Sequence, residues 1–179
     1  MSSLREYLAQ KRAALKLLQA RDPAVIEPVR LRAHVTAEGR SGVRRIRIRE
    51  HQIVSDSPAD FAGYNLGPAS PEIQLGVLGS CLTHIYLIQA ADREVPLDSL
   101  EVEVSATQDA RAGKPAFEDI PFYPHDIRYT VHVASSASRE DIDALHEAVE
   151  ARCPILNLLS RPQRIEGTVV LNGSEAVAA

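Results

Sequence analysis

The sequence contains no tryptophan, and aromatic residues make up only 4% of its 179 residues. A surface that stacks nucleic-acid bases on aromatic rings is therefore not expected. The net charge of -4 gives no general attraction to nucleic acid or to an anionic membrane. No run approaches the roughly 20 apolar residues of a membrane span, and the N-terminal MSSLREYLAQKRAALKLL lacks the apolar stretch of a signal peptide. We expect a cytoplasmic protein with no nucleic-acid or membrane partner.

Cysteine is also scarce, with only Cys81 and Cys153 in the chain. Two cysteines in a chain of this length do not build a disulfide scaffold. In a reducing cytoplasm such a pair is more often buried, catalytic or redox-active than structural. A Walker loop, a glycine-rich dinucleotide fingerprint and a nucleophile-elbow pentapeptide are also missing from the sequence.

What is present is a hydrophobic content of 45%, enough for one domain with a sizeable core. A first helix is predicted from Ser2 or Ser3, as its cap, to about Ala20, and the following Arg21-Asp22-Pro23 ends it. We divide the chain into an N-terminal helical extension, residues 1–22, and one domain, residues 23–179. The extension packs on the domain or on a partner chain; a membrane-surface helix is the less favoured alternative.

Two alternating segments, VRLRAHV and VRRIRIRE, flank a glycine-containing turn over Ala37–Gly42 and predict a β-hairpin. Ile46 and Ile48 share one face of the second strand, and a row of arginines, residues 45, 47 and 49, shares the other. We interpret this row as a solvated or partner-facing side in preference to a nucleic-acid stripe. HQIVSDSP extends the strand region, ADFAGYNLGPAS is a loop, and a long helix is predicted next.

This helix runs from about Ser70 to Ala91, with Ser70 as N-cap and Pro71 in the first helical position. It is almost uncharged from Ile73 onward, so we expect it to be buried on all sides. Its glycines lower helix propensity and predict close approach by a neighbouring backbone. Two strands, LDSLEVEVSATQD and IRYTVHVAS, a helix over SREDIDALHEAVEAR, a strand RIEGTVVLN and a tail SEAVAA follow. This order predicts an α+β fold with a mainly antiparallel sheet.

The cysteines lie at distinctive places in this pattern. Cys81 lies among small residues of the long helix, which leave room for a substrate or a second sulfur, and His84 shares its face three positions later. Cys153 follows the end of a helix, where a side chain can be presented at a surface. A lone helical cysteine is most often a small buried hydrophobe, and a cysteine–histidine pair falls short of the three or four ligands of a zinc site. His132 and His146 are expected to face solvent.

The segment SPEIQLGVLGSCLTHIYLIQAADREVPLDSLEVEVSA resembles the OsmC/Ohr superfamily of osmotically inducible and organic hydroperoxide resistance proteins, and is closer to its less characterised branches. CPILNLL is similar to the second motif of the family, in which Cys-Pro precedes a short helix. The resemblance implies an intertwined homodimer whose antiparallel sheets wrap around two central helices. It also implies a thiol-dependent peroxidase: Cys81 becomes a sulfenic acid, Cys153 condenses with it to a disulfide, and a dithiol or thioredoxin-like reductant restores the pair. No cofactor or metal is implied.

The resemblance further nominates Glu72 and Arg40 as groups that activate the Cys81 thiolate, Arg40 because AEGRSG resembles the arginine-bearing turn of the family. Glu72 and Cys81 are nine residues apart, a half-turn of rotation and a rise of about 13.5 Å on one helix. Glu72 must therefore act through an arginine or serve Cys81 of a partner subunit. Val77, Leu78 and Ile85 are expected to form apolar pocket walls, which favours organic hydroperoxides.

Two alternatives to the enzyme stay open. One is a non-catalytic module that binds a hydrophobic small molecule at the dimer interface, with cysteines that are merely buried. The other, less favoured, is a metal or redox sensor that uses Cys81, His84 and Cys153.

Overall fold

The computed structural model describes residues 4–172 and 177–178. All strand pairs in this part of the chain are antiparallel, which confirms the predicted α+β fold with antiparallel sheets. The helices are α1 (Leu4–Gln19), α2 (Ser70–Arg93), α3 (Arg139–Arg152) and α4 (Pro154–Ser160). The strands are β1 (His34–Ala37), β2 (Arg44–Ile48), β3 (His51–Ser55), β4 (Ser99–Thr107), β5 (His125–Ala134), β6 (Thr168–Val169) and β7 (Val177–Ala178).

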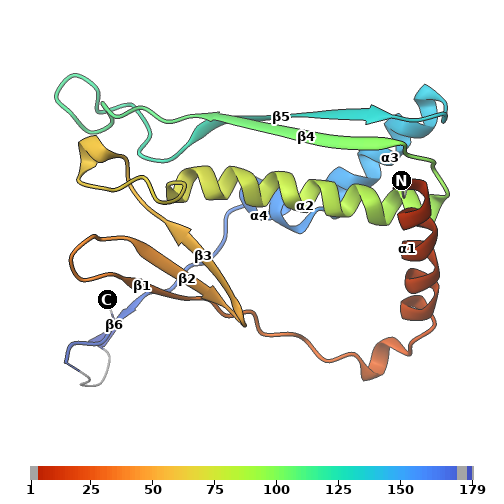
Figure 1. Cartoon of the computed structure of the whole chain (residues 1–179), viewed down its shortest axis with the longest axis horizontal. Coiled ribbons are helices and arrows are strands. Elements are labelled where there is room, and N and C mark those ends of the chain that lie inside the picture. Colours follow the sequence, from red (N-terminus) through yellow and green to blue (C-terminus); the bar gives the residue numbers. More distant parts are fainter. Residues whose placement is uncertain (1–3, 173–176, 179) are drawn as a thin grey trace.

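Helix α2 is the central element: β4 and β5 lie along one side of it, and α3 and α4 pack against it (Figure 1). It begins one residue earlier than predicted, because Ala69 and not Ser70 occupies the N-cap position. The Glu72 carboxylate accepts a hydrogen bond from the Ala69 backbone N–H at 2.7 Å, which satisfies one of the free donors of the first turn. The helix ends at Arg93, where Glu94 adopts a left-handed conformation.

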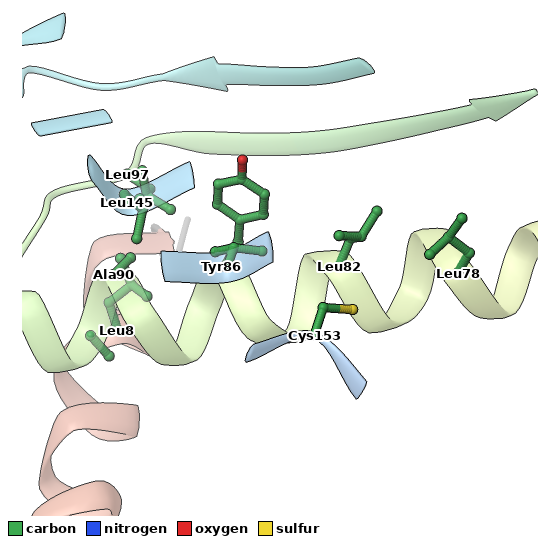
Figure 2. Close-up of a cluster of buried hydrophobic side chains, with 10 residues drawn as sticks. Leu8, Leu78, Leu82, Tyr86, Ala90, Leu97, Leu145 and Cys153 are labelled. Carbon is green, nitrogen blue, oxygen red and sulfur yellow. The ribbon is translucent and has the colours of Figure 1, made fainter. Parts of the chain in front are cut away.

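The core forms where α2, α3 and the β4–β5 sheet meet. Leu78, Leu82 and Tyr86 point from α2 toward β4 (Figure 2), and α3 adds Leu145. Successive residues of β4 alternate between half-buried and exposed, as a strand with one solvated face should. Gly79 lies under this strand, and a Cβ there would come within 3.2 Å of Val104 Cγ2. The predicted close approach is therefore found at Gly79.

The expectation that α2 is buried on all sides is wrong within one chain. Val77 is 41% exposed, and Gly76, Ser80 and His84 lie on the same open side. A Cβ at Gly76 would meet nothing within 4 Å among the described residues. By length and composition α2 could cross a membrane, contrary to the sequence expectation, but the core helix of a folded domain meets the same criteria. One face of α2 is thus packed as a core and the other is left open.

The first three strands form a separate antiparallel sheet in the order β1-β2-β3, below the N-terminal half of α2 in Figure 1. The predicted hairpin is confirmed, with Val35 opposite Ile46 and Ile46 opposite Ile53 on one face, but its first strand is shorter than VRLRAHV and begins only at His34. Arg45 and Arg47 lie on the other face, while Arg49 falls in the tight turn that follows β2 with a φ of 55°. The apolar face is largely exposed, since Val35 is 55% and Ile53 41% accessible.

Helix α1 packs across the C-terminal end of α2 (Figure 1). Its Leu8 is 4% exposed and belongs to the main core. Arg12 donates to the Ala91 carbonyl at 2.8 Å, and Arg5 donates to the Asp98 carboxylate at 2.5 and 3.1 Å. The proposed cap residues Ser2 and Ser3 lie outside the described residues.

The C-terminal region differs from the predicted strand and tail. The strand expected over RIEGTVVLN is confined to β6, and Val177–Ala178 of the expected tail pairs with it as β7. Backbone pairing of two short segments depends on a fold-back that hydrophobic alternation does not specify. The rest of the predicted tail lies outside the described residues.

Candidate functional site

The fold brings the two cysteines together. Cys81 lies in the middle of α2, and Cys153 lies between α3 and α4, whose short helix packs on α2. The two thiols lie close enough together that Cys153 raises the pKa of Cys81. Both are free cysteines, with Cys81 half-buried and Cys153 fully buried. The expectation that Cys153 is presented at a surface is therefore wrong: Figure 2 shows it beside α2, with Leu78 and Leu82 in the same core.

Cys81 forms part of the wall of a cavity of about 560 Å³ on the open side of α2. The walls are mostly apolar, with Ile73 and Val77 from α2 and Ile155 from α4. Val77 was expected here, whereas Leu78 and Ile85 belong to the core instead. Helical spacing explains the difference, because residues 73, 77, 81 and 84 follow one stripe of the helix and 78 and 85 do not. The site can accommodate an apolar organic molecule next to one sulfur.

The surroundings of Cys81 disfavour its thiolate. Burial raises the pKa of the Cys81 thiol, and the nearby Cys153 thiol raises it further. The backbone N–H of Ile155, in the first turn of α4, acts against these effects and lowers the pKa of Cys81. Within the described residues no arginine or lysine side chain lines the cavity. An additional proton acceptor or cation is needed for fast thiolate chemistry at neutral pH.

Glu72 and Arg40 lie apart from the Cys81 sulfur within one chain. Glu72 forms part of the same cavity wall but is exposed, and its carboxylate is engaged by the Ala69 N–H. Arg40 is exposed in the turn between β1 and β2. Neither residue is among the groups that affect the pKa of Cys81. No group of three or more metal-ligating side chains occurs in the described part of the chain, so the sensor alternative lacks a metal site there.

Sequence reasoning missed a buried carboxylate that shapes the loop before α2. Asp56 is 1% exposed, and its oxygens accept hydrogen bonds from the backbone N–H groups of Ser57, Tyr64 and Leu66 at 2.7, 3.0 and 3.1 Å. These bonds, with a smaller effect of the Arg44 charge, lower the pKa of Asp56. The Asp56 N–H donates to the carbonyl of Pro68 at 3.3 Å, and Pro68 forms part of the cavity wall. An aspartate before Ser-Pro at a strand end was the available signal.

A second missed cluster joins α2, α3 and β5. His146 was expected to face solvent, but its Nδ1 is hydrogen-bonded to the Tyr86 hydroxyl and its Nε2 lies 3.5 Å from Glu150. Tyr129 donates to the same carboxylate. Burial and the charge of Glu150 raise the pKa of Tyr86 to about 12. No sequence motif marks this cluster, because its members meet only when three elements pack together.

The fold and the site define a class: an α+β protein that places two thiols against one long central helix, beside an apolar cavity. The family model for OsmC-like protein matches residues 63–167, which is more than half of the chain. The chain therefore belongs to the OsmC-like protein family. Both cysteines lie within the matched residues.

Solved structures share this fold at low sequence identity. An OsmC-like protein from Mycoplasma pneumoniae aligns with a TM-score of 0.64 at 16% identity, over 75% of this chain and 89% of its own. An organic hydroperoxide resistance protein OsmC from Legionella pneumophila gives 0.53 at 12% identity, over 75% and 91%. A putative organic hydroperoxide resistance protein from Vibrio cholerae, with captopril bound in one of its active sites, gives 0.54 at 15% identity, over 78% and 90%. No curated protein matches the chain.

Proposed function

We propose that this chain is a thiol-dependent, peroxiredoxin-like hydroperoxide reductase that acts on organic hydroperoxides. The observation that carries the proposal is the proximity of Cys153 to Cys81 beside an apolar cavity. Membership of the OsmC-like family supports it, as do the hydroperoxide resistance proteins among the structural neighbours. The apolar side chains next to Cys81 favour an organic peroxide over hydrogen peroxide, because they stabilise a hydrocarbon substituent.

The proposed reaction begins when the Cys81 thiolate attacks the terminal oxygen of the hydroperoxide. An S–O bond forms, the O–O bond breaks, and the departing alkoxide takes a proton to leave as an alcohol. Cys81 is then a sulfenic acid. The Cys153 sulfur attacks the Cys81 sulfur, forms a disulfide and displaces the hydroxyl group, which takes the Cys153 proton and leaves as water. A dithiol or thioredoxin-like reductant returns both thiols by exchange and is itself oxidised to a disulfide.

The functional unit in this proposal is a homodimer in the cytoplasm. Glu72 is exposed on the open side of α2, Arg40 is exposed in a turn, and the sheet β1–β3 carries an exposed apolar face. A second copy that covers these surfaces would bring Glu72 and Arg40 of one chain to Cys81 of the other. Within one chain, Glu72 and Arg40 are not among the groups that affect the Cys81 pKa, which supports their action across a dimer interface.

A second candidate function is binding of an apolar molecule without turnover. The raised pKa of Cys81 favours it, since a thiol that stays protonated attacks peroxide slowly. In this case the cavity would retain the ligand and the two cysteines would remain reduced.

The two functions are separated by mixing the reduced protein with cumene hydroperoxide and counting free thiols. The enzyme should lose both thiols of each chain within seconds and form a disulfide between Cys81 and Cys153. Cys81→Ser should abolish peroxide consumption. Cys153→Ser should still react once but accumulate the sulfenic acid, which dimedone traps.

Equal and slow consumption by the wild type and Cys81→Ser would reject the reductase and favour the binding function. Arg40→Ala tests the proposed activator separately. If thiolate reactivity at neutral pH is unchanged in Arg40→Ala, Arg40 has no part in the site.

A further inference from the structure

The cavity beside Cys81 contains one basic side chain that the proposed reaction has not yet used. His84 lies on its wall, and the only other ionisable side chains there are Glu72 and Cys81 itself. All three come from α2. Cys153 adds its thiol next to Cys81, and α4 contributes the uncharged Ile155 with its backbone N–H. In the described part of the chain, His84 is therefore the one basic group placed at this cavity.

The position of His84 on the helix suits proton exchange with the reacting atoms. Residues three apart on a helix are neighbours, with Cβ atoms about 5–6 Å from one another, and His84 and Cys81 line the same cavity, so an imidazole at this position can approach the Cys81 sulfur or a substrate oxygen bound beside it. His84 is exposed, and no hydrogen bond or ion pair within residues 4–172 and 177–178 engages its ring. The ring therefore has no competing partner there and lies on the cavity wall.

We propose that His84 is a catalytic acid–base residue for Cys81, an inference that rests on the proposed reductase function. The neutral imidazole accepts the Cys81 proton, and the thiolate attacks the terminal peroxide oxygen. As the O–O bond breaks, the imidazolium donates the same proton to the departing alkoxide. The products are the alcohol, the Cys81 sulfenic acid and neutral His84, so protons and electrons balance. Imidazole is the side chain best suited to accept and return a proton near neutral pH.

This role is distinguishable from that of an arginine. A guanidinium stays protonated throughout the accessible pH range, so it stabilises a thiolate without adding a titration of its own. A histidine adds a limb near its own pKa to the pH–rate profile. If Arg40 of a partner chain alone activates Cys81, the pH–rate profile should show only the titration of the Cys81 thiol.

The test compares His84→Gln with His132→Gln as a matched control. His132 is an exposed histidine on β5, paired with Glu103 at 3.5 Å and outside the cavity. Two rates are measured from pH 5 to 10: oxidation of Cys81 by cumene hydroperoxide, and alkylation of Cys81 by iodoacetamide in Cys153→Ser protein. Circular dichroism confirms that each variant is folded. Both target histidines are exposed, so neither substitution disturbs the core.

His84→Gln should slow oxidation at pH 7 by roughly 100-fold, the lower range for a lost acid–base group. Its alkylation profile should lose the limb near neutrality and rise only at a higher, thiol-like pH. His132→Gln should match the wild type in both assays. Wild-type rates and profiles in His84→Gln would overturn the proposed role of His84. A wild type that consumes peroxide no faster than Cys81→Ser would instead overturn the reductase function, whatever the alkylation profile shows.

Discussion

Asp56 shows how one buried charge can determine the shape of the site. Its carboxylate accepts hydrogen bonds from three backbone N–H groups of the loop between β3 and α2, whose only regular element is a short 3-10 helix over Ala59–Phe61. These bonds replace the water that the donors would otherwise need. Gly63 lies in the same loop, where a Cβ would fall 1.9 Å from the Ser57 carbonyl oxygen. The loop can therefore follow this path only with glycine at that position. The loop leads directly to Pro68 and to the first turn of α2.

Asp56→Asn is expected to lower the thermal midpoint by several degrees at pH 7, because an amide NH₂ group would face backbone donors. The folded state lowers the Asp56 pKa from its usual value of 3.8, so its stabilising contribution is fully present above that pH and is lost as the pH falls through the lowered value. The difference between wild type and Asp56→Asn should shrink on acidification below pH 4. Thermal denaturation monitored by circular dichroism from pH 3 to 7 measures it. If the difference in thermal midpoint between wild type and Asp56→Asn is constant from pH 3 to 7, the Asp56 charge does not contribute to stability.

At the scale of elements, helix α2 has a packed face and an open face, and a glycine lies on each. Gly79 lies against β4, where the nearest atom to an added Cβ is the stiff, branched side chain of Val104. Gly76 lies on the open face, where an added Cβ meets nothing within the described chain. The same residue type therefore serves internal packing at one position and leaves space outside the chain at the other.

Gly79→Val should destabilise the protein by about 1–3 kcal/mol through overpacking. Gly76→Ala should stabilise an isolated chain by about 1 kcal/mol, the difference in helix propensity. Chemical denaturation of both variants measures these changes. If Gly76→Ala destabilises the protein, and more so at higher protein concentration, a second chain approaches closely at this face, as the proposed dimer requires.

At the scale of the whole molecule, the chain leaves apolar surface uncovered on the sheet β1–β3. Val35, Ile46, Ile48 and Ile53 share one face, and three of them are between 39% and 55% exposed. A contiguous apolar face of this kind is a signature of an interface. Together with the open face of α2, it is consistent with an intertwined homodimer in which each chain completes the other.

Ile53→Asp should dissociate the proposed dimer, because it places a charge in the centre of this face. The control is Gln52→Asp, on the same strand but on the opposite face. Sedimentation velocity over a range of concentrations is expected to give a dimer for the wild type and the control, and a monomer for Ile53→Asp. The monomer should also lose peroxide consumption if Glu72 or Arg40 acts across the interface. A wild-type monomer at all concentrations would reject the dimer.

The sequence by itself determined most of the elements and the family. Local signals sufficed for the hairpin around β2, for α2 and for α3, because alternation, helix caps and prolines act over a few residues. The two cysteine motifs indicated the family, because Cys81 lies in a helix of small residues and Cys153 is followed by a proline. Of the three apolar residues expected to form the pocket walls, Val77 lies at the cavity, whereas Leu78 and Ile85 pack in the core.

Only the tertiary structure decided what surrounds the cysteines. The burial of Cys153, its proximity to Cys81, and the meeting of Tyr86, Tyr129 and His146 depend on how α2, α3 and β5 pack, which no local pattern encodes. The same packing leaves one face of α2 open, although its sequence is apolar nearly all round. The hydrophobic effect favours burial of an apolar surface, but long-range contacts determine which element buries it. For Cys81 these contacts supply a second thiol, an apolar cavity and a histidine on its wall.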